Sequence, residues 1–269
     1  MSSETTSGYT LQLSDAERDR YRLMAAMARE NEAELWTLAG IRPGASVADV
    51  GCGPGAVLVE LARVVGSNGT AVGVEPGAPA REAAREELDA AGFPGVEVRE
   101  GDGGATGLEP DSWDAVMMRH VLTHTGPAAD GIVAHLATLL APGGHLYLVD
   151  VDLDAFRCTP RDSALEQQFA AYAEFHRSLG NDTRMGPRLG AMMRTSGLEV
   201  VEHRGFFQRV PGVMVATGGP LASAKDAMIA AGIMTSEDAE RWEGERHRFA
   251  GIPDAEIFSP VFVAIGRRP

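Results

Sequence analysis

The sequence predicts a doubly wound α/β fold, in which a mostly parallel sheet is covered by helices on both faces. Short apolar runs alternate with helical stretches over about residues 44–152. These runs show no alternation of polar and apolar residues, which is typical of strands that are buried on both faces. The 32 glycines among 269 residues also suit a fold with many tight strand-to-helix turns.

The expected elements follow this alternation along the chain. A first helix over 15–39 begins with a capping box at Ser14–Glu17 and ends at Gly40. The expected strands of the α/β region cover residues 46–50, 70–75, 96–100, 113–118 and 145–151, and the helices between them cover 54–65, 78–91 and 132–140. Further along, helices are expected over 162–179, 188–195 and 221–249, and strands over 198–207 and 257–265. We expect the last two strands to complete the same sheet.

The chain shows no linker, repeat or low-complexity segment that would separate two large domains. We therefore expect an N-terminal helical cap over 1–43 and one domain over 44–269. Within that domain, residues 44–152 form the core, and residues 153–269 add the C-terminal strands and the substrate-side helices.

The charge of the chain restricts its partners. Lys and Arg total 24 and Asp and Glu total 38, so the formal charge is 24 − 38 = −14. Binding to nucleic acid or to an anionic membrane surface requires a cationic face, so neither partner is expected.

Cys52 and Cys158 lie far apart and belong to no zinc or disulfide pattern. The chain has no basic and apolar leader and no run of eighteen apolar residues, so we expect a cytoplasmic protein.

A glycine-rich loop follows the first expected strand. Its residues run Asp-x-Gly-x-Gly-x-Gly from Asp49, with glycines at 51, 53 and 55, and a helix follows. Glycines allow a sharp turn and a close approach of the backbone to a ligand, and the free N–H groups of a helix start favour an anionic group. A plain turn between strand and helix would use glycines in the same way. The spacing differs from the Gly-x-Gly-x-x-Gly of nicotinamide sites.

Two acidic residues follow the next two expected strands. Glu75 ends the second strand, 20 residues after Gly55, where a carboxylate can bind both hydroxyls of a ribose. Asp102 follows the third strand, where it can accept from an adenine amino group. Since open α/β sheets bind ligands at the carboxyl ends of their strands, these acids and the glycine loop are expected to form one site.

At this point the sequence resembles the class I S-adenosylmethionine-dependent methyltransferases, and within them the small-molecule methyltransferases of the ubiquinone and menaquinone biosynthesis type. The resemblance covers roughly residues 9–151, with weaker matches beyond. Five segments carry it in the right order, namely VADVGCGPG, VGVEP, EGD, SWDAVMMRHVLTH and LAPGGHLYLVD, and MGPRLGAMMRTSGL is a weaker match beyond them.

The resemblance implies a Rossmann-like, seven-stranded sheet with an antiparallel last strand and an N-terminal helical lid. It also implies a set of residues that bind S-adenosylmethionine. These are Asp49, Gly51 and Gly53 at the methionine moiety, Glu75 and Pro76 at the ribose, Asp102 and Gly103 at the adenine, the carbonyl of Arg119 at the ammonium, and Tyr21 of the lid near the sulfonium. The sequence departs from the usual pattern at Gly103, where Ala is common, and at Thr123, where Glu often precedes the histidine.

Two histidines are candidates for a catalytic base or for orienting the substrate. His120 and His124 stand four residues apart after the fourth expected strand, so on a helix they would share one face. For each of them a structural, hydrogen-bonded role is the more ordinary interpretation, and no third ligand supports a metal site. For His176 we expect a solvated helix face, and for Arg157 and Arg184 surface charges.

The sequence therefore predicts transfer of a methyl group from S-adenosylmethionine to an oxygen or nitrogen, and less directly a carbon, of a small organic molecule. Catalysis by positioning the reactants requires no fixed sequence motif. A protein of the same fold that has a cyclase-like or binding role and transfers no methyl group therefore stays an alternative. A second alternative is a nicotinamide-dependent oxidoreductase, but the spacing of the glycines argues against it. A homodimer stays open.

Overall fold

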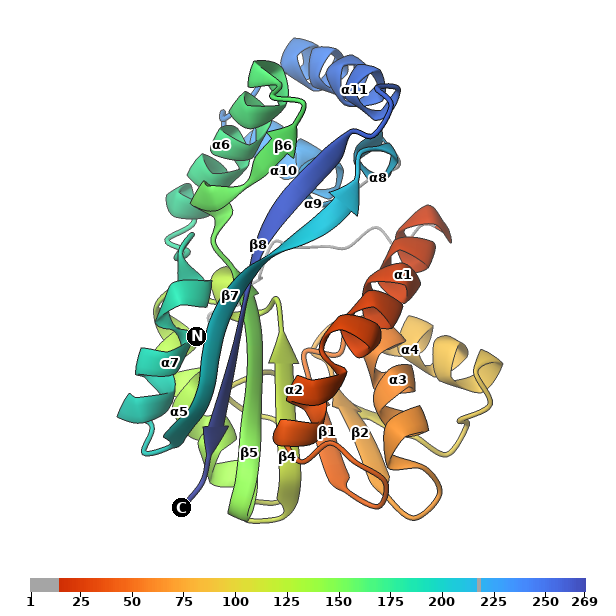
Figure 1. The fold of residues 1–269 in the computed structure, drawn as a ribbon, viewed down its shortest axis with the longest axis vertical. Coiled ribbons are helices and arrows are strands. Elements are labelled where there is room, and N and C mark those ends of the chain that lie inside the picture. The colour runs from red at the N-terminus through yellow and green to blue at the C-terminus, as the bar shows by residue number, and fades with distance from the viewer. Residues whose placement is uncertain (1–14, 217–218) are drawn as a thin grey trace, which may run out of the picture.

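An eight-stranded sheet runs through the structure and carries helices on both faces (Figure 1). The computed structural model describes residues 15–216 and 219–269. The strands are β1 Ser46–Val50, β2 Thr70–Val74, β3 Glu97–Arg99, β4 Trp113–Arg119, β5 Leu140–Val151, β6 Arg157–Thr159, β7 Glu199–Pro211 and β8 Glu256–Arg267. The helices are α1 Asp15–Asn31, α2 Ala33–Leu38, α3 Ala56–Val65, α4 Ala78–Ala90, α5 Ala129–Leu139, α6 Ser163–Ser178, α7 Met185–Thr195, α8 Val213–Ala216, α9 Pro220–Ser223, α10 Lys225–Ala230 and α11 Ser236–Ala250.

The order of the strands is that of a doubly wound sheet. β3, β2, β1, β4 and β5 lie side by side and run parallel. β8 is antiparallel to β5 and lies between β5 and β7. The predicted fold class, with its antiparallel last strand, is therefore confirmed. The eighth strand, β6, was not predicted, because it has three residues and only continues the line of β5 along β8.

Each face of the sheet has its own core. On one face, alternate residues such as Val47 and Met117 pack with Trp36 of α2 and Leu58 of α3. On the other face, their neighbours in the strands pack with α5 and α7. Trp36 is 2% exposed and packs the first helical region onto the sheet.

The long strands β7 and β8 extend beyond the rest of the sheet and carry a second group of helices (Figure 1). We call α6, β6 and α8 to α11 the distal lobe. The lobe has a small core of its own, in which Tyr172 and Phe175 of α6 pack with Met228 of α10 and Trp242 of α11.

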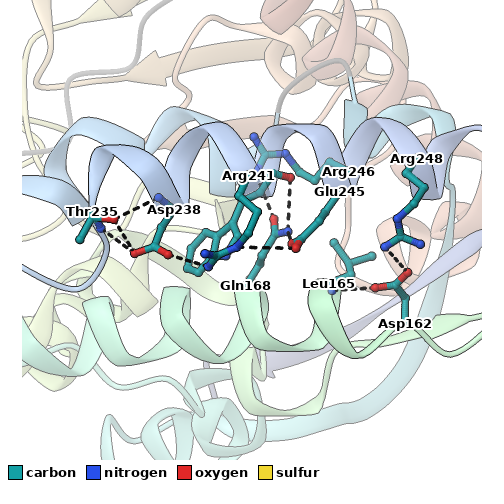
Figure 2. A network of polar contacts seen from close by, with 10 residues as sticks. Asp162, Leu165, Gln168, Thr235, Asp238, Arg241, Glu245, Arg246 and Arg248 are labelled. Carbon is teal, nitrogen blue, oxygen red and sulfur yellow. Dashed lines mark hydrogen bonds and ion pairs between the residues drawn. The ribbon is translucent and has the colours of Figure 1, made fainter.

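Polar contacts join α6 to α11 inside the distal lobe, as Figure 2 shows. The fully buried amide of Gln168 accepts from Arg246 at 3.0 Å and donates to Glu245 at 3.0 Å. Asp162 accepts from the backbone of Leu165 at the start of α6 and from Arg248 of α11. These bonds fix how the two helices lie against each other.

Two expected helices are interrupted. The helix predicted over 15–39 breaks at Glu32, whose backbone leaves the helical region while its carboxylate binds residues of the sheet. The helix predicted over 221–249 is three shorter helices, since Gly232 adopts a φ of 70° and Thr235 starts α11 with a capping box. The capping box predicted at Ser14 includes a residue outside the described ranges.

Candidate active site

The carboxyl ends of β1 to β5, which we call the carboxyl edge, bring the predicted residues together. Asp49 lies in β1 one residue before its end, and its side chain is 2% exposed. Its Oδ2 is buried and has no hydrogen-bond partner among the described residues. Burial, with a smaller contribution from Glu75, raises the pKa of Asp49 to about 7, although Arg119 acts in the opposite direction. A buried carboxylate without a partner is costly, and a cationic group beside it would remove that cost.

The glycine loop needs its glycines for two different reasons. Gly51, Gly53 and Gly55 all adopt positive φ, which side chains other than glycine rarely tolerate. A Cβ at Gly51 would also lie 2.6 Å from Val121, and one at Gly55 would lie 2.9 Å from Ala84. A Cβ at Gly53 would meet nothing within 4 Å. Gly53 therefore borders open space, and the other two glycines let the loop pack closely.

Glu75 is tied to the glycine loop by its own carboxylate. Its Oε2 accepts from the N–H of Gly53 at 3.1 Å, and its Oε1 accepts from the N–H of Gly77 at 2.9 Å. Arg81 of α4 also holds the segment at Glu75 and Pro76 in place, because its guanidinium donates to their carbonyls at 2.9 and 2.6 Å. Arg81 was not singled out in the sequence, since a helical arginine before a glutamate-rich run resembles a surface charge.

Asp102 shapes the turn after β3. Its Oδ1 accepts from the N–H groups of Gly104 and Ala105 at 2.8 and 2.9 Å, and the residue is exposed at the carboxyl edge. A Cβ at Gly103 would lie 2.9 Å from Cγ2 of Ile132 and 3.0 Å from Cε of Met118. The bulk of Ile132 and Met118 therefore explains why glycine replaces the alanine that the resemblance implies.

Arg119 points its side chain away from the carboxyl edge and toward the N-terminal helices. Its guanidinium donates to both carboxylate oxygens of Glu32, at 2.5 and 3.0 Å, and Tyr147 donates to the same carboxylate at 2.6 Å. Burial acts to raise the pKa of Glu32, but the charge of Arg119 and these hydrogen bonds outweigh it and lower the pKa. The end of β4 is thereby held against the junction of α1 and α2.

The two candidate histidines do not share a helix face, because the segment that carries them is not an α-helix. His120 follows β4 with a φ of 54°, and His124 ends a 3₁₀ turn over Leu122–His124. The cause is Asp150 of β5, which accepts from both the N–H and the hydroxyl of Thr123 and draws the segment into a tight turn. Burial, and then the charge of Arg119, lower the pKa of His120 to about 3, which makes it a weak base. His124 is exposed at the carboxyl edge.

His176 is buried, which contradicts the solvated position predicted for it. It is 1% exposed, and its ring centroid lies 4.9 Å from that of His124 and 4.6 Å from that of Tyr172. The prediction failed because α6 also packs against other helices of the distal lobe. The sequence pattern of one helix does not reveal which of its polar positions another helix will cover. The structure thus brings a third histidine to the segment after β4.

The other predicted residues occupy the outer parts of the site. Tyr21 of α1 lines a small recess with Pro54, Ala56 and Ala83, close to the start of α3, and the guanidinium of Arg20 lies 4.7 Å above its ring. Pro76 is exposed beside Glu75. Arg157 and Arg184 are both exposed, as expected for surface charges.

In the part of the chain that the structure describes, no three His, Cys, Asp or Glu side chains gather as a metal site. None of the helices within 15–216 and 219–269 combines the length and the apolar character that a membrane span requires.

Comparison with known proteins agrees with the geometry. Residues 47–144 match a family model described as a methyltransferase domain. Over 114 residues the chain is 37% identical to a nocamycin O-methyltransferase of Saccharothrix syringae, covering 42% of this chain and 40% of that protein. It is 25% identical over 202 residues to a ubiquinone/menaquinone biosynthesis C-methyltransferase of Teredinibacter turnerae, covering 66% of this chain and 78% of that one.

The fold has a counterpart among solved structures. A methyltransferase structure from Bacillus halodurans superposes with a TM-score of 0.59 at 19% identity, covering 89% of this chain and 99% of that one. The chain spans well under half the length of the curated relatives that match it with most identity, for example 40% of the nocamycin enzyme. Residues 47–144 of this chain therefore match a methyltransferase domain, and the chain has the fold of the solved structure from Bacillus halodurans.

Proposed function

We propose that this protein transfers a methyl group from S-adenosylmethionine to a small organic acceptor, at oxygen or nitrogen or, less directly, at carbon. The observation that carries the proposal is the buried, unpaired Oδ2 of Asp49 beside the glycine loop. No described side chain or backbone group forms a hydrogen bond with this oxygen, whereas the ammonium of a methionine moiety would.

The residues present fit the cofactor in two further respects. The open space in front of Gly53 gives room for a group lying against the backbone of the loop. Glu75 and Asp102 follow β2 and β3, in the order in which the sheet places them beside β1. Glu75 would therefore hold the ribose hydroxyls and Asp102 an adenine amino group, with Gly103 and Pro76 beside them.

When bound, S-adenosylmethionine supplies a methyl group already activated on a sulfonium. The chain's own task is to hold the nucleophile of the acceptor in line with that group, which is worth several kcal/mol of the barrier. Asp150 holds the 3₁₀ turn over Leu122–His124 in place through its hydrogen bond with Thr123. The acceptor can bind against this turn. If the acceptor must lose a proton, His124 is better placed than His120, because it is exposed at the carboxyl edge and its pKa is lowered less, to about 4 against about 3.

The relatives support a small acceptor. One is a nocamycin O-methyltransferase, and another is a C-methyltransferase of ubiquinone and menaquinone biosynthesis. The formal charge of −14 argues against nucleic acid as the acceptor.

The test is a reaction of the protein with methyl-labelled S-adenosylmethionine and a fractionated extract of its source cells. We expect label in a small-molecule fraction, with little or none for Glu75→Ala and an unchanged yield for Glu199→Ala, which lies on β7 far from the carboxyl edge. Label found in protein or nucleic acid alone would refute the small acceptor. Binding of S-adenosylhomocysteine without any label transfer would favour the fold without methyl transfer.

A further inference from the structure

Four buried side-chain atoms in the described residues lack a hydrogen-bond partner. Two are the indole nitrogens of Trp36 and Trp113, which lie in the hydrophobic cores of the sheet. The third is Oδ2 of Asp49, which the cofactor would satisfy. The fourth is Nε2 of His176, and nothing in the proposed binding of the cofactor accounts for it. Since buried polar groups without partners are rare in folded proteins, this nitrogen requires an explanation.

The other ring nitrogen of His176 fixes which atom carries the hydrogen. Nδ1 lies 3.1 Å from Nδ2 of Asn181, and an amide NH₂ can only donate. Nδ1 must therefore accept, so the neutral ring carries its hydrogen on Nε2. The unpaired atom of His176 is thus a donor that needs an acceptor.

The surroundings keep this ring neutral and hold it in place. Burial, and then the nearby His124, lower the pKa of His176 to about 4, so the ring is uncharged at physiological pH. Tyr172 and Phe175 contact it edge-on, with ring centroids 4.6 and 5.7 Å away. A neutral N–H enclosed by rings gains strongly from an oxygen that reaches it, because water does not compete there.

The ring also lies against the part of the site where an acceptor is expected. His124 follows β4 at the carboxyl edge, and its ring centroid is 4.9 Å from that of His176. The turn that carries His124 is anchored by Thr123 to Asp150 of β5. α6 itself packs against the turn at Leu153–Ala155, directly after β5. His176 therefore stands above the ends of β4 and β5, on the side of the distal lobe.

We propose that His176 binds the methyl acceptor by donating its Nε2–H to an oxygen of that molecule. The acceptor is then a compound with a carboxylate, enolate, phenolate or carbonyl oxygen close to the methylated atom. A simple protonated amine offers no lone pair to this donor and is excluded. The inference rests on the proposed function, since it assigns the acceptor side of the same site.

The test uses, as the source of acceptor, the unreacted small-molecule fraction of the extract that gives rise to labelled product with methyl-labelled S-adenosylmethionine. His176→Phe keeps a ring of similar size but has no N–H, and His176→Gln places an amide N–H near the position of Nε2. We expect His176→Phe to lower kcat/KM for the acceptor fraction by about 10- to 100-fold, the usual effect of losing a hydrogen bond to a charged or polarised oxygen. His176→Gln should recover part of this loss. His145→Gln, at the opposite end of the sheet, should behave as the wild type.

Two further measurements separate binding from folding. The affinity for S-adenosylhomocysteine should be unchanged in both His176 variants, because no cofactor residue is altered. In ¹⁵N spectra of the histidine rings at pH 7, His176 should be neutral and protonated at Nε2.

Each contrary result has a definite meaning. Protonation of His176 at Nδ1, an acceptor kcat/KM unchanged in His176→Phe, or a labelled product without any oxygen would overturn this inference alone. A His176→Phe variant that has also lost affinity for S-adenosylhomocysteine, with no rescue by His176→Gln, would show a structural role and overturn it as well. Absence of label with the wild-type protein would overturn the proposed function, and this inference with it.

Discussion

Glu32 and Arg119 form a two-point ion pair, although 87 residues separate them in the sequence. Both side chains are largely buried, and the hydroxyl of Tyr147 donates to the same carboxylate. The pair joins the break between α1 and α2 to the end of β4. Since Arg119 is also the residue whose carbonyl is expected at the cofactor ammonium, the N-terminal helices and the cofactor site share one anchor.

Glu32→Gln should strongly destabilise the protein. Removing one partner of a buried ion pair leaves the other charge uncompensated, which costs about 3–5 kcal/mol. Tyr147→Phe removes a single hydrogen bond and should cost about 1–2 kcal/mol. Chemical denaturation of both variants checks this, with Glu30→Gln as a control, because Glu30 is exposed on α1. Equal stability of Glu32→Gln and Glu30→Gln would contradict the anchoring role.

Asp49→Asn should change the pH dependence of stability. In the folded protein the pKa of Asp49 is raised to about 7, well above its ordinary value, so the folded state binds a proton that the unfolded state has released. Stability therefore falls as pH rises from about 4 to 7 and is level above that. Asn cannot ionise, so the variant does not lose stability in this way. For a pKa shift of this size, the loss of stability in the wild type is on the order of 2–4 kcal/mol.

The measurement is the difference in Tm between Asp49→Asn and the wild type, taken from pH 5 to pH 8. We expect the difference to grow in favour of the variant as pH rises, while its affinity for S-adenosylhomocysteine falls about 10-fold or more. A constant difference in Tm across this range would show that Asp49 titrates normally. Unchanged affinity would remove Asp49 from the cofactor site.

Arg81→Ala should weaken cofactor binding without touching the cofactor. Arg81 holds the carbonyls of Glu75 and Pro76, so its loss frees the segment that positions the Glu75 carboxylate. We expect about a 10-fold rise in the Kd for S-adenosylhomocysteine, as is common when a supporting hydrogen-bonded group is lost. Arg85→Ala, one turn further along α4, provides the control for removing a helical arginine. Equal affinities of the two variants would mean that Glu75 needs no such support.

Gly103→Ala should destabilise the protein even though alanine is common at this position in the family. The new methyl group would lie 2.9 Å from Ile132 and 3.0 Å from Met118, and such overpacking costs about 1–3 kcal/mol. At Gly104 a Cβ would approach nothing closer than 3.5 Å, so Gly104→Ala serves as a matched control. A Gly103→Ala variant with the Tm of Gly104→Ala would show that Ile132 can move aside without cost.

The sequence predicts the core of this fold well because the signals there are local. β1 coincides with the expected strand, since an apolar run bounded by glycines has only one good placement in a parallel sheet. The break at Glu32 depends instead on Arg119, a partner 87 residues away, and no local pattern contains it.

The site divides in the same way. The positions of Asp49, Glu75 and Asp102 follow from strand ends and were predicted to meet, and the structure brings them to one edge. The arrangement of His120, His124 and His176 depends on long-range contacts, namely the pull of Asp150 on Thr123 and the packing of α6 in the distal lobe. The spacing of His120 and His124 in the sequence therefore does not reveal how the two side chains lie.

The pairing of β7 with β8 over their full length has a mechanical consequence. Beyond a bulge between Val200 and Glu202, both strands stay paired from the central sheet into the distal lobe, so the two regions share one ladder of backbone hydrogen bonds. Opening the lobe on a flexible joint would require breaking that ladder, whereas twisting the ribbon would keep it intact. Admission of a molecule beneath α6 is therefore expected to proceed by torsion of a stiff two-stranded arm, with the histidines at its base moving least.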